Sequence, residues 1–272
     1  MPMGPSVLVV DHVAASPILV HVPHASRSVP AWARGTMTAD AAQISRELDA
    51  MTDAHTDLIA LAANDACSAS ASLFINQLSR LVVDPERFPD DREEMLQVGM
   101  GAVYTRGHEG AGLRSETDTN NQGELLTTVF EPYTQRFTKL VDQILERHQR
   151  AVIIDLHSFP KMALPYELHG SDPRPEICLG TDQFHTSPAL LLAAEGAFHE
   201  HQTQINTPFS GSFVPLAHYQ RDDRVQSIMI EVRRDQYLAQ DLAPEPVGIR
   251  RVSQALADLI AAVEGADGGA AA

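Results

Sequence analysis

The sequence predicts an α/β fold with a mostly parallel or mixed central sheet flanked by helices. Two observations support this prediction: short apolar strands alternate with helical segments, and several of these strands run directly into polar residues. In such folds the ligand site lies at the carboxyl ends of the strands. We expect one domain over residues 1–264 and a disordered tail, GADGGAAA, over residues 265–272.

The first half of the chain supplies two strand regions, a helical region and a long loop. A short, mainly apolar run at Ile18–Val22 predicts a strand that ends at Pro23. Residues 39–66 favour helix, because Leu48, Met51, His55 and Leu58 recur at three- and four-residue spacing. Residues 70–84 favour one or two strands, and the irregular, polar stretch 89–123 predicts a functional loop.

The second half alternates helices and strands more regularly. Residues 127–150 form a strongly amphipathic pattern and predict a helix. Strands are expected at 151–156 and 176–180, a helix from Pro188, a last strand at 227–234, and a helix from about Pro244 to Glu264. Strands separated by helices in this way favour parallel pairing.

Composition excludes several classes of partner. The formal net charge of −16 argues against binding to nucleic acid or to an anionic membrane surface. The chain has no apolar run long enough for a transmembrane span and no secretory signal pattern, and its two cysteines cannot form a disulfide framework. We therefore expect a cytoplasmic protein, in which any anionic substrate would need local arginines.

Two histidines lie at the ends of apolar strands. His24 follows the strand 18–22, and His157 lies in the stretch AVIIDLHSFP. Two neutral imidazoles and a carboxylate are a frequent set of zinc ligands. Either histidine alone could equally be a structural residue with satisfied hydrogen bonds, but two at comparable strand ends favour a metal site. Asp155 could orient His157 or hold a neighbouring loop.

Glu231 lies among apolar residues in SIMIEVRRDQYL. The alternation of Met229, Glu231 and Arg233 could form a polar, solvent-facing side of the strand. If Glu231 instead faces a cleft, burial would raise its pKa and make it suitable as a general base.

Other polar clusters have a structural and a functional interpretation. Arg80, Asp84 and Arg87 could form local ion pairs, or the arginines could bind a substrate carboxylate in bidentate geometry. Asp49, Asp53 and Asp57 would share one face of a helix, where one of them could complete a metal site. His218 and Tyr219 belong to a polar loop.

Motifs for other chemistries are missing. The sequence contains no P-loop, G-x-G-x-x-G, H-E-x-x-H or G-x-S-x-G. A serine nucleophile at Ser26 or Ser158 is the weaker hypothesis, because no nucleophile-elbow motif surrounds either residue.

An ordered set of segments resembles the N-formylglutamate amidohydrolase family. The segments are VPHAS (22–26), TDAHTD (52–57), SRLVVDPER (79–87), DLHS (155–158), ICLGT (177–181) and VPLAHYQRDDRVQSIMIEVRRDQY (214–237). They cover most of the chain in the order in which the family has them. This family is related to the zinc carboxypeptidases, so the resemblance implies a zinc-carboxypeptidase-like (phosphorylase/hydrolase-like) fold.

The resemblance also implies roles for individual residues. His24 and His157 would bind zinc, and Glu231 would act as the general base on a water that zinc activates. The carboxypeptidases have a glutamate three residues after their first histidine, where this chain has Arg27, so Asp53 is the expected third ligand and Asp49 its alternative. Substrate binding is assigned to Arg80, Arg87, Ser158, His218 and Arg233, and the orientation of His157 to Asp155.

The implied reaction is the hydrolysis of an N-acylated acidic amino acid, with N-formyl-L-glutamate as first candidate and histidine degradation as the associated process. Two alternatives stay open: the same zinc-dependent chemistry on a small peptide or cell-wall fragment, and a non-catalytic binding protein on the same fold. The family usually has Asn where this chain has Glu86, and often an aromatic residue where it has Ala54, and both differences concern the substrate.

Overall fold

Strands from all parts of the chain form one mixed sheet in the computed structural model, which describes residues 6–67, 70–168 and 173–265. Within these residues the sheet has seven strands in the order β1-β3-β2-β4-β7-β5-β6. Their bounds are β1 (Val7–Val10), β2 (Ile18–Val22), β3 (Ser72–Asn76), β4 (Ala151–Phe159), β5 (Ile177–Gly180), β6 (Thr203–Ile205) and β7 (Val225–Arg233). The pairs β1·β3 and β5·β7 are antiparallel, and the other pairs are parallel. The predicted fold class is confirmed.

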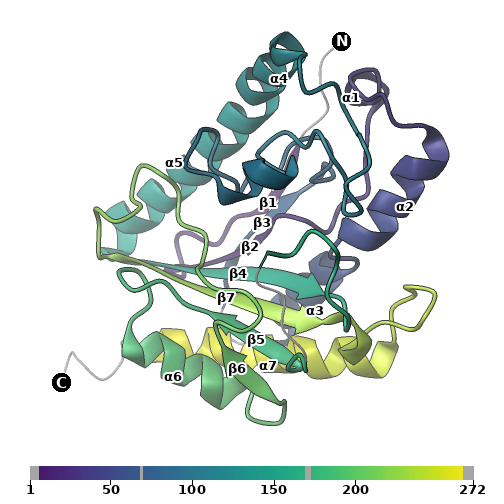
Figure 1. The fold of residues 1–272 in the computed structure, drawn as a ribbon. Coiled ribbons are helices and arrows are strands. Elements are labelled where there is room, and N and C mark those ends of the chain that lie inside the picture. Colours follow the sequence, from purple (N-terminus) through teal and green to yellow (C-terminus); the bar gives the residue numbers. More distant parts are fainter. Residues whose placement is uncertain (1–5, 68–69, 169–172, 266–272) are drawn as a thin grey trace.

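Helices cover both faces of the sheet (Figure 1). They are α1 (Ala31–Arg34), α2 (Ala41–Met51), α3 (Thr56–Ala66), α4 (Thr119–Leu125), α5 (Glu131–His148), α6 (Pro188–Ala197) and α7 (Pro246–Gly265), and a π-helical segment (Leu126–Phe130) joins α4 to α5. Short 3₁₀ helices occur at Glu94–Val98 and Arg234–Gln236. Helices α3, α6 and α7 pack on one face of the sheet, and α5 packs on the other.

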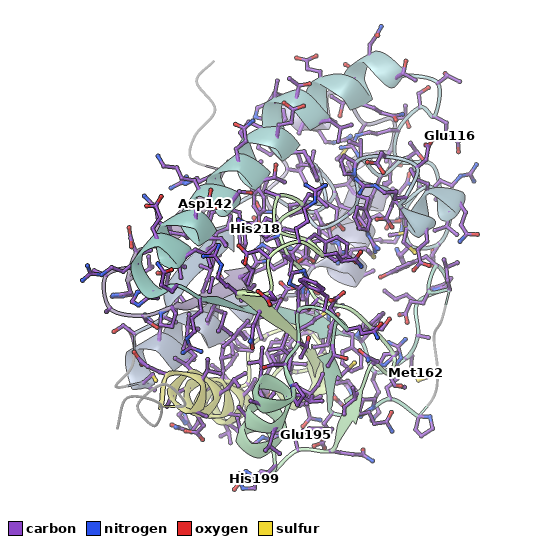
Figure 2. All side chains as sticks on the ribbon, turned by 90° about the vertical axis from the view of Figure 1, so that its left-hand side faces the viewer. Glu116, Asp142, Met162, Glu195, His199 and His218 are labelled. Carbon is purple, nitrogen blue, oxygen red and sulfur yellow. The ribbon has the colours of Figure 1, made fainter. Side chains whose placement is uncertain are left out.

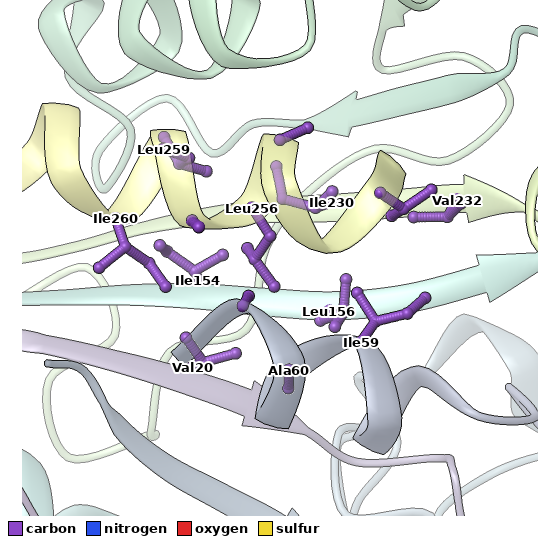
Figure 3. Packing of buried hydrophobic residues seen from close by; sticks show 14 of the residues in the cluster. Val20, Ile59, Ala60, Ile154, Leu156, Ile230, Val232, Leu256, Leu259 and Ile260 are labelled. Atoms are coloured by element: carbon purple, nitrogen blue, oxygen red, sulfur yellow. The ribbon is translucent and has the colours of Figure 1, made fainter. Parts of the chain in front are cut away.

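Side-chain alternation along the central strands separates the two hydrophobic cores. In β4, Ile154 and Leu156 face α3 and α7, where Leu256 and Ile260 pack against them (Figure 3). Ala151 and Ile153 face α5 instead. Burial of each large apolar side chain contributes about 1.5–3 kcal/mol, so these two layers fix the orientation of the sheet. Asp155 and His157 continue the α5-facing series toward the carboxyl end of β4.

The region 39–66, expected to favour helix, forms two helices, α2 and α3, with a break between them. Thr52 is extended, and His55 adopts a left-handed conformation with φ of 65°. The main-chain N–H of Asp53 donates to the carbonyl of His24 at 3.0 Å. This tertiary contact replaces a helical hydrogen bond and brings Asp53 to the end of β2.

Other elements differ from the prediction in extent. The region 70–84 forms only β3, followed by turns, and the strands β1 and β6 were not predicted. The loop 89–123 contains a 3₁₀ helix and the first residues of α4. The predicted tail lies outside the described residues except for Gly265, which ends α7. Among the helices described, none is long and apolar enough to cross a membrane.

Candidate active site

Three neighbouring strands bring their polar residues together at one edge of the sheet. His24 follows β2 by two residues, while His157 and Glu231 lie near the ends of β4 and β7. His157 and Glu231 are direct partners in the parallel pairing of β4 and β7, so their side chains point to the same face. His24, Asp53, His157 and Glu231 are all at most 8% exposed.

His24, Asp53 and His157 direct three donor atoms at one point. The Nδ1 atoms of the two histidines are 3.3 Å apart, and Asp53 Oδ2 lies 3.2 Å from Nδ1 of His157 and 3.6 Å from Nδ1 of His24. Burial by itself would raise the pKa of Asp53, but the hydrogen bonds to His157 and His24 hold that pKa well below its ordinary value. Asp53 is therefore ionised.

Carboxylates lie behind both imidazoles. Nε2 of His24 lies 2.9 Å from Asp84 Oδ1 in a hydrogen bond. Nε2 of His157 lies 3.1 Å from Asp155 Oδ2 and 3.2 Å from Glu86 Oε2. The hydrogen bond to Asp84 favours the tautomer of His24 with the proton on Nε2, which leaves its Nδ1 lone pair free for a cation. Nε2 of His157 makes no hydrogen bond to the two carboxylates near it. Burial alone would lower the pKa of His157, but the charges of Glu86 and Asp155 raise it well above its ordinary value.

The geometry and chemistry of this donor set fit a zinc ion. At Zn–N and Zn–O lengths near 2.0–2.1 Å, tetrahedral ligands lie about 3.4 Å from one another, which matches the separations among His24, Asp53 and His157. These three residues form one of the groups in the described chain whose ligand atoms all lie within 4.8 Å.

A buried network holds Asp155 in place. Its Oδ1 lies 2.9 Å from Nδ1 of His21, and Nε2 of His21 lies 2.6 Å from the hydroxyl of Tyr133 on α5. The main-chain N–H of Phe213 donates to Asp155 Oδ2 at 3.3 Å. Because these contacts fix the carboxylate, Asp155 can fix the ring of His157 in turn.

Glu231 faces the same space as the histidines. Burial raises the pKa of its carboxyl group to about 8, although the nearby charge of His157 acts in the opposite direction. Its Oε2 is buried and has no hydrogen-bond partner among the described residues. A carboxyl group with a pKa near neutrality can take up and release protons, which is the requirement for a general base.

A cavity of about 550 Å³ opens over these residues, and we call it the first cavity. Arg80, Arg87 and Arg234 contribute guanidinium groups to its wall. Arg80 donates to Asp84 Oδ2 at 2.7 Å, and Arg234 donates to the carbonyl of Ala50 at 2.7 Å. Arg87 has longer contacts, 3.4 Å to Glu93 and 3.7 Å to Asp84, so its N–H groups are the most available of the three arginines for a ligand.

Several sequence-predicted residues lie elsewhere. His218 lies beside α5, where it hydrogen-bonds Asp142 at 2.8 Å (Figure 2), and it does not line the first cavity. Arg233 donates to Asp235 and to the carbonyl of Arg174 and does not line the cavity either. Asp49 is exposed and pairs with Arg27 at 2.6 Å, away from the histidines.

The two serines considered as nucleophiles lie in different places. Ser158 lines the first cavity and accepts a hydrogen bond from Nε of Arg234 at 3.4 Å. Ser26 is not among the lining residues and donates to the carbonyl of Gln77.

Sequence reasoning gave no role to Glu86 or Arg234, although both line the first cavity. Strand alternation favoured Arg233, on the same side as Glu231, but β7 ends at Arg233 and the chain turns into a 3₁₀ helix. This turn directs Arg234 toward Asp53, with Nη2 at 3.4 Å from Oδ1. Glu86 was visible only as a departure from the family pattern.

A family model described as N-formylglutamate amidohydrolase matches residues 16–238. Two solved structures resemble the fold: N-formylglutamate amidohydrolase from Ralstonia eutropha JMP134 (21% identity, TM-score 0.78, 97% of this chain and 99% of that chain covered) and a gene product from Agrobacterium tumefaciens (20%, 0.72, 97% and 97%). At these identities the likeness to solved structures concerns the fold. None of the curated proteins compared with the sequence matches it significantly.

Proposed function

This chain belongs to the N-formylglutamate amidohydrolase family of amide-bond hydrolases, and we propose that it hydrolyses N-formyl-L-glutamate to formate and L-glutamate in a metal-dependent reaction. The observation that most supports the proposal is the convergence of His24, Asp53 and His157 beside the buried Glu231. We place the reaction in the cytoplasm, where the two cysteines, both free in the structure, would stay reduced.

We assign the metal to His24 Nδ1, His157 Nδ1 and a carboxylate oxygen of Asp53. When bound, zinc would polarise the acyl oxygen and lower the pKa of a bound water. Asp84 would keep His24 in the tautomer that leaves Nδ1 unprotonated, and Asp155 would orient His157.

Glu231 is the proposed general base. It would take a proton from the attacking water and then deliver it to the nitrogen of the departing amino acid, so that the carbon–nitrogen bond breaks and a free amine leaves. In the metal-free fold burial raises its pKa to about 8. A cation bound beside it would lower this pKa, and a carboxyl group that titrates near neutrality can both accept and return a proton.

The guanidinium groups would position the two carboxylates of the glutamate. Arg87 is the best placed for a bidentate contact because its present contacts are long, and Arg80 keeps Nη1 available beside it. Arg234 is held by Ala50 and contributes positive charge next to Asp53. Ser158, beside Arg234 in the same cavity, can add a hydroxyl contact.

Elemental analysis and a deformylation assay, before and after chelation, test the proposal. We expect about one zinc per chain, loss of formate release on chelation, and recovery when metal is returned. Protein that binds no divalent metal, or that keeps full activity as Glu231→Gln, would contradict the mechanism. Bound metal without turnover of formylglutamate would keep the chemistry and exclude the substrate.

A further inference from the structure

A second cavity of about 420 Å³ follows the first along the same face of the sheet. Both cavities share five wall residues, Glu86, Arg87, Glu94, Ser210 and Met229. The pair His157 and Glu231 lines the first cavity, and the preceding register pair, Asp155 and Met229, lines the second. Two residues along a strand correspond to about 6–7 Å, so the second cavity begins about one small acyl group away from the catalytic pair.

We propose that the second cavity is an acyl subsite, and that the enzyme accepts N-acyl-L-glutamates whose acyl group is apolar or aromatic and larger than formyl. This inference rests on the proposed function, since it extends the substrate of the same site. It assigns the amino-acid part of the substrate to the first cavity and the acyl part to the second.

Aromatic and apolar side chains line much of the second cavity. They are Phe88, Phe130, Phe213, Val214, Leu216 and Tyr219. Phe88 and Tyr219 meet edge to face, with ring centroids 6.0 Å apart. Leu216 is 38% exposed, so this apolar surface is accessible to a ligand. Such a lining favours an aliphatic chain or an aromatic ring over a polar group.

Charge directs the two halves of the substrate to different cavities. Arg80 and Arg234 line only the first cavity, where they attract the glutamate carboxylates. The wall of the second cavity has more carboxylates than guanidinium groups: Glu86, Glu93, Glu94, Asp155 and Asp182 against Arg87 and Arg92. This excess of negative charge disfavours a dicarboxylate in the second cavity, whereas an uncharged acyl group is unaffected by it.

The boundary between the cavities contains features that a ligand would complete. Met229 has an unbranched, flexible side chain that can change rotamer to open a passage. Glu86 Oε1, in the wall of both cavities, is buried and makes no hydrogen bond among the described residues, although His21 Nδ1 lies 3.4 Å from it. Ser212 Oγ, in the wall of the second cavity, is likewise buried without a hydrogen-bond partner among these residues. Buried polar atoms without partners are uncommon, so a bound substrate or its water would relieve their cost.

Hydrolysis of a larger acyl group forms and breaks the same bonds as hydrolysis of the formyl group. Water adds to the acyl carbon, the carbon–nitrogen bond breaks, and the acyl group leaves as a carboxylate while glutamate leaves as an amine. Glu231 takes the water proton and passes it to the nitrogen. The carboxylates of the second cavity, which outnumber its two arginines, would then favour release of the product carboxylate.

Steady-state kinetics with N-formyl-, N-acetyl- and N-benzoyl-L-glutamate test the inference in the metal-loaded protein. We expect kcat/KM for the benzoyl compound to lie within about tenfold of that for the formyl compound. Thr134 of α5 is half-buried and lines only the second cavity, so Thr134→Phe would fill it. We expect this variant to lose about tenfold or more in kcat/KM for the benzoyl compound and to keep its activity on the formyl compound.

Two further variants serve as an independent block of the cavity and as a control. Leu216→Trp blocks the same cavity from another segment, and should reproduce the selective loss if Thr134→Phe folds poorly. Thr128→Phe is the matched control, because Thr128 is exposed and lines neither cavity.

The outcomes separate the inference from the proposed function. Hydrolysis of the formyl compound alone, benzoylglutamate that inhibits without turnover, or an equal loss on both substrates in Thr134→Phe would overturn the acyl subsite and leave the proposed function intact. Hydrolysis of none of the three compounds would overturn both.

Discussion

Replacement of Glu231 by glutamine should stabilise the metal-free protein while abolishing turnover. In the metal-free fold, burial raises the pKa of this carboxyl group from an ordinary value of 4.5 to about 8. Between these two pH values the group is protonated in the folded chain and ionised in the unfolded chain. Folding must therefore protonate it, and this cost disappears when the residue cannot ionise.

The magnitude follows from the interval of pH over which the cost accumulates. At pH 7, the difference between the pH and the ordinary pKa of 4.5 makes protonation of Glu231 on folding cost about 3 kcal/mol, at 1.36 kcal/mol per pH unit. Glu231 is 8% exposed, so solvent screens this cost little. For a chain of this length the gain should raise Tm by about 4–6 °C. Loss of the base should lower kcat by about 10²–10⁴-fold in the metal-loaded protein.

Thermal unfolding of the two metal-free proteins at several pH values gives the decisive measurement. The sign of the effect is specific: the stabilisation should grow as pH rises from about 4.5 to about 8, and stay constant above that. Glu146→Gln, at an exposed position on α5, is the matched control and should show no such gain. An unchanged Tm near neutrality, or a difference that persists at low pH, would refute a neutral, buried Glu231.

Three other substitutions test the site and the core. Asp53→Asn should lower zinc affinity by about 10–100-fold or more, as measured by competition with a chromogenic chelator. The control Asp49→Asn should not lower it, because Asp49 is exposed and paired with Arg27. Equal losses in the two variants would contradict the ligand assignment. Arg87→Met should raise KM for formylglutamate about tenfold or more with zinc content unchanged, and a wild-type KM would remove Arg87 from substrate binding. Leu256→Ala should destabilise the fold by about 2–5 kcal/mol in urea unfolding, since Leu256 is fully buried beneath the sheet; a change below about 1 kcal/mol would contradict that packing.

The elements that the sequence predicted best are those whose patterns follow from burial. Strand β2 has the predicted limits, Ile18–Val22, because every side chain in this short run is buried between neighbouring strands and helices. Helix α6 begins at the predicted Pro188 because proline fits a first turn. In contrast, β6 was missed because its three residues are partly exposed and lie at an edge of the sheet.

Some residues of the candidate site could be predicted from the sequence and others could not. Strand ends indicated His24, His157 and Glu231, because a polar residue after or within an apolar run stands out in the sequence. Helical spacing could not separate Asp49 from Asp53, since both fall on one face of a continuous helix. The choice depends on a tertiary contact, from the main chain of Asp53 to His24, that breaks the helix.

The distribution of the site between two kinds of structure has an evolutionary consequence. The proposed metal ligands and base come from strand ends and from a helix break held by main-chain contacts. The walls of the first cavity come largely from loops, such as residues 160–168 and 206–210. Loops tolerate substitution and insertion better than the strands that they connect. Related chains can therefore acquire new substrate preferences through their loops while the chemistry of the strand ends is inherited unchanged.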